Sequence, residues 1–127
     1  MRRLIVIGLV GALGLGMGGC ITPSIPIPPP DPARMTFDVT EGPGSTATFS
    51  YPAEANYGSA IVYVYNRDLG VGIIEQARDD GSVGPTQPVA ARLDDQIVVT
   101  FQLEDQTVGR CIRLRDGIQD PNTYCGP

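Results

Sequence analysis

The amino-acid sequence predicts an all-β domain, a sandwich of about seven short strands. Three observations lead to this prediction. One segment in the second half of the chain alternates apolar and polar residues with a period of two. Turn-forming residues recur between short runs of β-branched and aromatic residues. No stretch keeps a helical period over the length that a stable helix needs.

The clearest strand is expected at Gln96–Glu104. Ile97, Val99, Phe101 and Leu103 alternate there with mostly polar residues. This is the pattern of a strand with one buried face and one wetted face. We therefore expect these four side chains in the core.

A second strand is expected at Ala60–Asn66, with Val62 and Val64 on one face. Its other face is also apolar or aromatic, so the strand is either central in its sheet or presents tyrosines to a partner. The residues of that face are Ile61, Tyr63 and Tyr65.

Five weaker strands complete the pattern, each short and rich in β-branched or aromatic residues. They are expected at Met35–Thr40, Ala47–Tyr51, Val71–Arg78, Val89–Leu93 and Val108–Leu114. Glycine, proline and aspartate mark the turns between them. Residues 35–127 have the size of one small sandwich domain.

A proline-dense segment, residues 21–34, precedes this domain. Prolines stand at positions 23, 26, 28, 29, 30 and 32. Such density disfavours helix and sheet and favours an extended polyproline II chain. At ~3.1 Å per residue the segment would reach about 40 Å, as a stiff tether. A proline-rich recognition motif is the alternative reading.

Residues 1–19 have the composition of an export signal. Arg2 and Arg3 precede the apolar run Leu4–Leu15, which is broken only by glycines. The positive start stays on the cytoplasmic side during export. Because the run falls short of the ~20 residues of an ordinary membrane span, a removable signal fits better than an anchor helix.

Met17, Gly18, Gly19 and Cys20 close this segment. They resemble the lipobox of bacterial lipoproteins, with Met17 where leucine is usual. The resemblance implies that Cys20 becomes the mature N-terminus and carries a diacylglycerol and often a further acyl chain, such as palmitate, which anchors the protein to a membrane. An ordinary secretory signal with an incidental cysteine is the alternative. Ile21, which is not an aspartate, implies the outer membrane by the sorting habit of enteric bacteria.

The charge and composition of the chain argue against some classes of function. Without residues 1–19 the chain keeps seven arginines against fourteen acidic residues, which argues against nucleic acid as a partner. The chain has no histidine, so the commonest general base and zinc ligand are missing. We expect a protein that is not an enzyme and needs no cofactor.

Cys111 and Cys125 remain once Cys20 is assigned to lipid. An even pair in an exported protein predicts a disulfide, because export leads to an oxidising compartment. A metal site is the rival interpretation, and it lacks further soft ligands.

The segment from Ser59 to Leu114 resembles the repeating unit of bacterial immunoglobulin-like domains, and related carboxypeptidase-regulatory-like sandwiches share much of the pattern. The matching features are the valines of the strand at Ala60–Asn66, the turn Asp80-Gly81-Ser82, and Asp95 before the strand at Gln96–Glu104. Asp94 departs from the usual glycine. The resemblance implies an immunoglobulin-like, Greek-key sandwich.

Two sets of residues are candidate sites. Asp79, Asp80, Asp94 and Asp95 are a weak calcium candidate if their two loops meet, and plain turn formers otherwise. A tyrosine set is a candidate binding face, adhesive or carbohydrate-stacking, although such side chains more often cover a core edge. Its members are Tyr57, Tyr63 and Tyr65.

We therefore expect a lipid-anchored cell-envelope protein whose small sandwich serves interaction with an envelope protein or envelope structure. The alternative is an accessory or small-ligand-binding lipoprotein subunit of an envelope complex.

Overall fold

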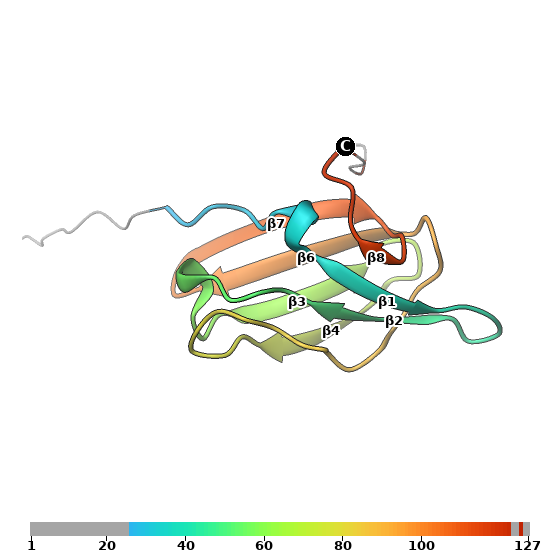
Figure 1. Cartoon of the computed structure of the whole chain (residues 1–127), viewed down its shortest axis with the longest axis horizontal. Helices are drawn as coiled ribbons and strands as arrows, with labels where there is room; N and C mark the ends of the chain where they lie inside the picture. Colours follow the sequence, from blue (N-terminus) through green and yellow to red (C-terminus); the bar gives the residue numbers. More distant parts are fainter. Residues whose placement is uncertain (1–25, 123–124, 126–127) are drawn as a thin grey trace, which may run out of the picture.

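A computed structural model of the chain describes residues 26–122 and residue 125. Within these residues, eight strands form two four-stranded antiparallel sheets. The sheets pack face to face as a β-sandwich (Figure 1). The predicted fold class is confirmed.

The first sheet has the strand order β5-β2-β1-β8, and the second has the order β4-β3-β6-β7. The strands of the first sheet are β1 (Thr36–Thr40), β2 (Thr46–Ser50), β5 (Val89–Ala90) and β8 (Gly117–Ile118). Those of the second sheet are β3 (Ile61–Asn66), β4 (Val71–Gln76), β6 (Gln96–Leu103) and β7 (Gln106–Arg113). Two 3₁₀ turns lie at Pro32–Arg34 and Ala55–Tyr57.

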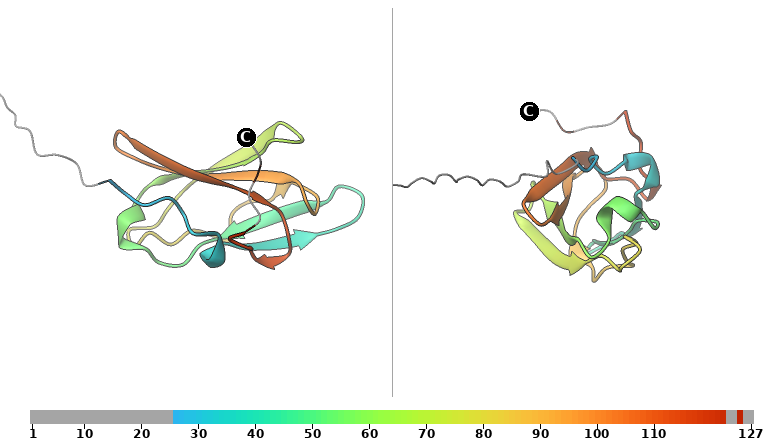
Figure 2. Two further views of the ribbon diagram at one scale, coloured as in Figure 1. Left: turned by 90° about the horizontal axis from the view of Figure 1, so that it is seen from above. Right: turned by 90° about the vertical axis from the view of Figure 1, so that its left-hand side faces the viewer.

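These strand orders are those of an immunoglobulin-type sandwich. Strands β1 to β7 take the places of strands A, B, C, C′, E, F and G, with A, B and E in one sheet and C′, C, F and G in the other. The hairpin β3–β4 and the hairpin β6–β7 lie in the same sheet, joined by a chain that visits the first sheet at β5 (Figure 2). Strand β8 is added beside β1.

The core lies between the sheets and contains the residues that the period-two pattern selects. Ile97, Val99 and Phe101 are fully buried, and Leu103 packs against the core at its margin. On β3, the inward valines Val62 and Val64 are fully buried too. The predicted faces of the two strongest strands are therefore confirmed.

The structure differs from the sequence prediction at the C-terminal end. Gly117 and Ile118 form β8, which pairs with Thr36 and Phe37 of β1. Only two residues pair, so no periodic pattern marks this strand in the sequence. The buried side chain of Gln119 holds it in place by donating to the carbonyls of Arg115 and Gly117.

The proline-dense segment also differs from the extended tether that we expected. From Ile27 onwards it lies against the sandwich: Ile27 packs on the core, and Pro30 and Pro32 are buried. Packing begins here, eight residues before the predicted domain boundary at residue 35. Polar side chains of the sandwich, described below, bond to the backbone of this segment and fix its path.

Candidate functional site

Cys20, the predicted lipidation site, lies outside the described residues. Among the residues that the structure describes, no helix is long and apolar enough to cross a membrane. The described chain starts at Pro26 and meets the sandwich beside the β6–β7 hairpin, where the backbone N–H of Ile27 donates to Oε1 of Gln106 at 2.9 Å. Any spacer between Cys20 and the folded body therefore spans about six residues.

The predicted disulfide between Cys111 and Cys125 is present. Cys111 lies on β7, the edge strand of the second sheet, and the two Cα atoms are 5.3 Å apart. The backbone N–H of Cys125 donates to the carbonyl of Cys111 at 3.4 Å. The bond thus holds the C-terminal tail against the outer edge of β7.

The four aspartates do not form one site, because their two loops lie at opposite ends of β3. The carboxylate of Asp79 accepts from the hydroxyl of Ser59, before β3 begins, at 3.0 Å. The carboxylate of Asp95 accepts from Asn66, where β3 ends, at 2.8 Å. Six strand residues at about 3.3 Å each put about 20 Å between the loops. A calcium site shared by the four aspartates would require the two loops to meet, and the structure contradicts this.

Each aspartate loop instead has a local structural role. The carboxylate of Asp80 accepts from both the hydroxyl and the backbone N–H of Ser82, and these bonds lower its pKa. Buried Asp95 accepts from the Asn66 amide and from the backbone N–H of Arg92. In the described part of the chain, no three acidic or cysteine side chains gather as a metal would require.

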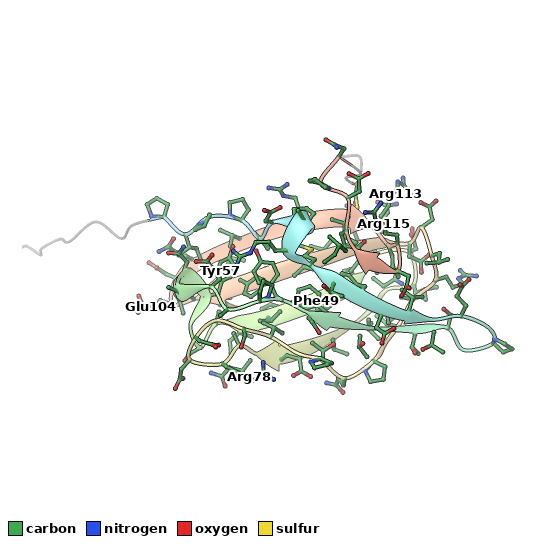
Figure 3. The ribbon with its side chains drawn as sticks, in the orientation of Figure 1. Phe49, Tyr57, Arg78, Glu104, Arg113 and Arg115 are labelled. Atoms are coloured by element: carbon green, nitrogen blue, oxygen red, sulfur yellow. A yellow bond between two sulfur atoms is a disulfide. The ribbon has the colours of Figure 1, made fainter. Side chains whose placement is uncertain are left out.

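Tyr57 does not belong to a tyrosine binding face. Its ring is 1% exposed and stacks on Phe101 between the sheets. Figure 3 shows it at the same end of the sandwich as Glu104. Tyr57 lies in a 3₁₀ turn, so no strand alternation in the sequence indicates which way its side chain points.

Tyr63 and Tyr65 do share a face, the outer surface of the β4-β3-β6-β7 sheet. Tyr63 is half-buried, and its hydroxyl donates to Oε1 of Gln102 at 2.7 Å. Tyr65 is 44% exposed and lies opposite Gly72 of β4. Added at Gly72, a Cβ atom would lie 3.1 Å from Cδ1 of Tyr65, so the glycine makes room for this ring.

This outer surface, which we call the uncharged face, carries no side chain that is charged at neutral pH over three registered rows of residues across four strands. Its apolar members include Ile74, which is 62% exposed. The twelve positions are Ile61, Tyr63, Tyr65, Gly72, Ile74, Gln76, Val98, Thr100, Gln102, Thr107, Gly109 and Cys111. In an acidic protein, such a neutral area is suited to a neutral partner.

The opposite outer surface is hydroxyl-rich and hollowed. One hollow of about 300 Å³ is lined by side chains that include Thr48, Asp38 and Asp116. A second, of about 470 Å³, is lined on one side by Arg34 and Ile118. Thr36 and Ser50 border both hollows, so the two lie next to each other on β1 and β2.

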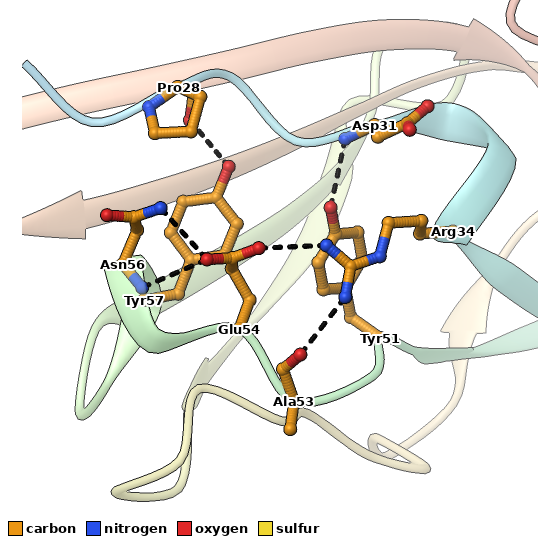
Figure 4. A network of polar contacts seen from close by, with 8 residues as sticks. All are labelled: Pro28, Asp31, Arg34, Tyr51, Ala53, Glu54, Asn56 and Tyr57. Atoms are coloured by element: carbon orange, nitrogen blue, oxygen red, sulfur yellow. Dashed lines mark hydrogen bonds and ion pairs between the residues drawn. The ribbon is translucent and has the colours of Figure 1, made fainter.

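A polar network fixes the N-terminal segment across one side of the sandwich (Figure 4). The hydroxyl of Tyr57 donates to the carbonyl of Pro28. The hydroxyl of Tyr51 accepts from the backbone N–H of Asp31 at 3.0 Å. Burial raises the pKa of both tyrosine hydroxyls.

Arg34 and Glu54 close the network with an ion pair of 2.8 Å. Arg34 also donates to the carbonyl of Ala53, and its guanidinium lies 5.4 Å from the centre of the Tyr51 ring. The Glu54 carboxylate accepts from the backbone N–H of Asn56 as well, and the bonds from Asn56 and Arg34 lower its pKa. The sequence pattern gave no sign of this network, because its members come from turns and from a proline-rich segment.

No family model, curated protein or solved structure matches the chain.

Proposed function

We propose that this chain is a lipid-anchored cell-envelope protein whose immunoglobulin-like sandwich serves interaction or envelope structure. The run Met17 to Cys20, placed after an apolar segment with a positive start, carries the proposal. The Cys111–Cys125 disulfide supports it, since disulfides persist in oxidising compartments outside the cytoplasm. The outer membrane is the proposed location, because Ile21 rather than aspartate follows Cys20.

The architecture supports a non-enzymatic role. The chain has no histidine, and its dense carboxylates form loop bonds at opposite ends of β3. A sheet face that combines tyrosine, isoleucine, glutamine and threonine is typical of a surface that binds by area and neutral hydrogen bonds. We assign the interaction to the uncharged face, and the partner to the envelope rather than to nucleic acid.

The test is Cys20→Ser in cells that export the full chain. The variant is expected to move from the membrane to the soluble fraction and to lose labelling by a fatty-acid analogue. Ser24→Ala, a small change four residues further on, is the matched control and is expected to stay in the membrane. Membrane retention and unchanged labelling of Cys20→Ser would contradict the anchor.

The two adjacent hollows on β1 and β2 favour a second candidate, a small-ligand-binding subunit of an envelope complex. Hydroxyls of Thr36, Thr48 and Ser50 offer the donors and acceptors that a polar ligand requires. Pull-down from detergent-solubilised envelopes distinguishes the candidates. A stoichiometric complex that Thr48→Val weakens and Tyr65→Ser leaves intact would favour the subunit, and the reverse result would favour the uncharged face.

A further inference from the structure

The edges of the two sheets are not protected equally. Antiparallel strands point the N–H and C=O of alternate residues outward, and an unprotected edge is a template for another strand. Each sheet has two edges. Within the described residues, the backbone of three of these four edges is hydrogen-bonded to another segment over part of its length. The fourth edge, strand β4, has no such bonds among these residues.

The first sheet is protected on both sides. On β2, the backbone N–H of Phe49 donates to the hydroxyl of Thr86, and the N–H of Thr86 donates back to the carbonyl of Phe49. Tyr51 exchanges two backbone bonds with Val83 further along the same edge. On the β1 side, beyond the short β8, the N–H of Val39 donates to the Asp116 carboxylate at 2.9 Å.

In the second sheet, the C-terminal tail covers part of the β7 edge through its bond to Cys111. The opposite edge is β4. Next to β4, the backbone N–H of Ala77 donates to the carbonyl of Ala60. Because backbone groups alternate in direction along an antiparallel strand, the N–H and C=O groups of Gly72, Ile74 and Gln76 then point away from β3. Among the described residues, no hydrogen bond joins these outward backbone groups to another segment.

We propose that β4 pairs edge to edge with β4 of a second copy of this chain. Antiparallel pairing about a two-fold axis at Ile74 places this residue opposite its own counterpart, and Gly72 opposite Gln76. The two sheets then continue as one sheet of eight strands. Two copies of Ile74, each 62% exposed alone, cover one another on the outer surface.

The side chains of β4 allow two copies of the strand to pair. The only charged residue of β4 is Glu75, and in this register it lies opposite Ile73 rather than its own counterpart. Glu75 also accepts from the backbone N–H of Gln87 within its own copy. The outward-facing residues Gly72, Ile74 and Gln76 belong to the uncharged face, so two acidic molecules would meet along a strand on which Glu75 is the one charged residue of each copy. This inference is independent of the lipid anchor.

The decisive experiment is Ile74→Cys in the full chain, exported by intact cells and analysed without reductant. Directly opposed residues in such a pair have Cα atoms about 5.5 Å apart, within disulfide range. We expect a cross-linked dimer with twice the mass of one chain. Leu93→Cys is the matched control, since Leu93 is 42% exposed on the turn before β6, and it is expected to remain monomeric.

A second variant tests the same edge without a new thiol. Ile74→Lys places two ammonium groups side by side and is expected to abolish the dimer of the purified full chain, while Leu93→Lys keeps it. Equal melting temperatures would show that both variants fold. Salt is expected to strengthen the wild-type dimer by screening the repulsion between two acidic chains.

Three results would overturn the proposal. They are a wild-type chain that sediments as a monomer at all salt concentrations, equal cross-linking of Ile74→Cys and Leu93→Cys, or cross-linking of Ile74→Cys to a chain of a different mass. The last result would assign the edge to a strand of another protein. Cross-linking at Ile74 does not depend on Cys20, so loss of lipidation leaves this test intact.

Discussion

The ring of Tyr57 stacks on the ring of Phe101, with centroids 4.1 Å apart and planes 18° apart. The stack joins a 3₁₀ turn at one end of the sandwich to the middle of the fold, because Phe101 belongs to the central strand β6. Tyr51 meets Phe101 edge-on at 5.5 Å, so the two tyrosines hold Phe101 from two directions. An aromatic cluster at this end therefore links the core to the N-terminal segment.

Phe101→Ala is expected to lower the free energy of unfolding by about 3–5 kcal/mol, since it removes a fully buried ring from this cluster. Val98→Thr, on the half-buried outer face of the same strand, is expected to cost less than about 1 kcal/mol. Urea unfolding of both variants measures the difference. Equal losses would mean that β6 is buried on both faces.

Tyr51→Phe and Tyr57→Phe are each expected to loosen the N-terminal segment, because each removes a hydroxyl that bonds to its backbone. The cost is about 1 kcal/mol per bond. Hydrogen exchange at the amide of Asp31 is the readout for Tyr51→Phe, and protease cleavage near Pro28 for Tyr57→Phe. Tyr63→Phe, whose hydroxyl bonds to Gln102 on the other sheet face, is the control. Release of the segment by the control would show a general loss of stability.

The bonds of the Glu54 carboxylate lead us to expect that acid lowers the stability of the fold. Its pKa is lower in the folded protein than in the unfolded chain, owing to its bonds with Asn56 and Arg34. Its stabilising contribution is therefore complete above the unfolded pKa of about 4.5 and is lost as pH falls through the folded pKa. Glu54→Gln is expected to flatten the stability curve below about pH 4.5. A slope identical to that of the wild type would contradict this role.

Reduction of the Cys111–Cys125 disulfide is expected to cost about 3 kcal/mol, the chain-entropy value for a loop of roughly 15 residues. Cys111→Ala with Cys125→Ala is expected to show a similar loss by urea unfolding. Mass spectrometry after alkylation without reductant measures the bond directly. Two alkylated thiols in protein matured outside the cytoplasm would show that the pair is free.

Strand periodicity was enough to predict the buried faces of β3 and β6. On β3 and β6, alternate residues face one side, so the buried sets containing Val64 and Phe101 follow from spacing alone. The position of Tyr57 does not follow from spacing, because a 3₁₀ turn has no two-residue alternation. The separation of Asp80 from Asp95 depends on which end of β3 each loop reaches, and this is set by the pairing of distant strands.

The packing of the proline-dense segment was harder still to predict. Its composition predicts an extended chain but does not say whether that chain lies free or against a surface. Ile27 is the one apolar side chain in the described part that interrupts the prolines, and it packs on the core. Its docking also depends on Tyr51 and Tyr57, which are distant in the sequence.

The docked segment also decides how the molecule responds to mechanical force. A pull on Pro26 is first resisted by the packing of Ile27, by its backbone bond to Gln106 of β7 and by the hydroxyls of the two tyrosines. It then enters the first sheet through β1, which is paired with β2 on one side and with β8 on the other, so the force reaches the sheet at a strand that is held from both sides.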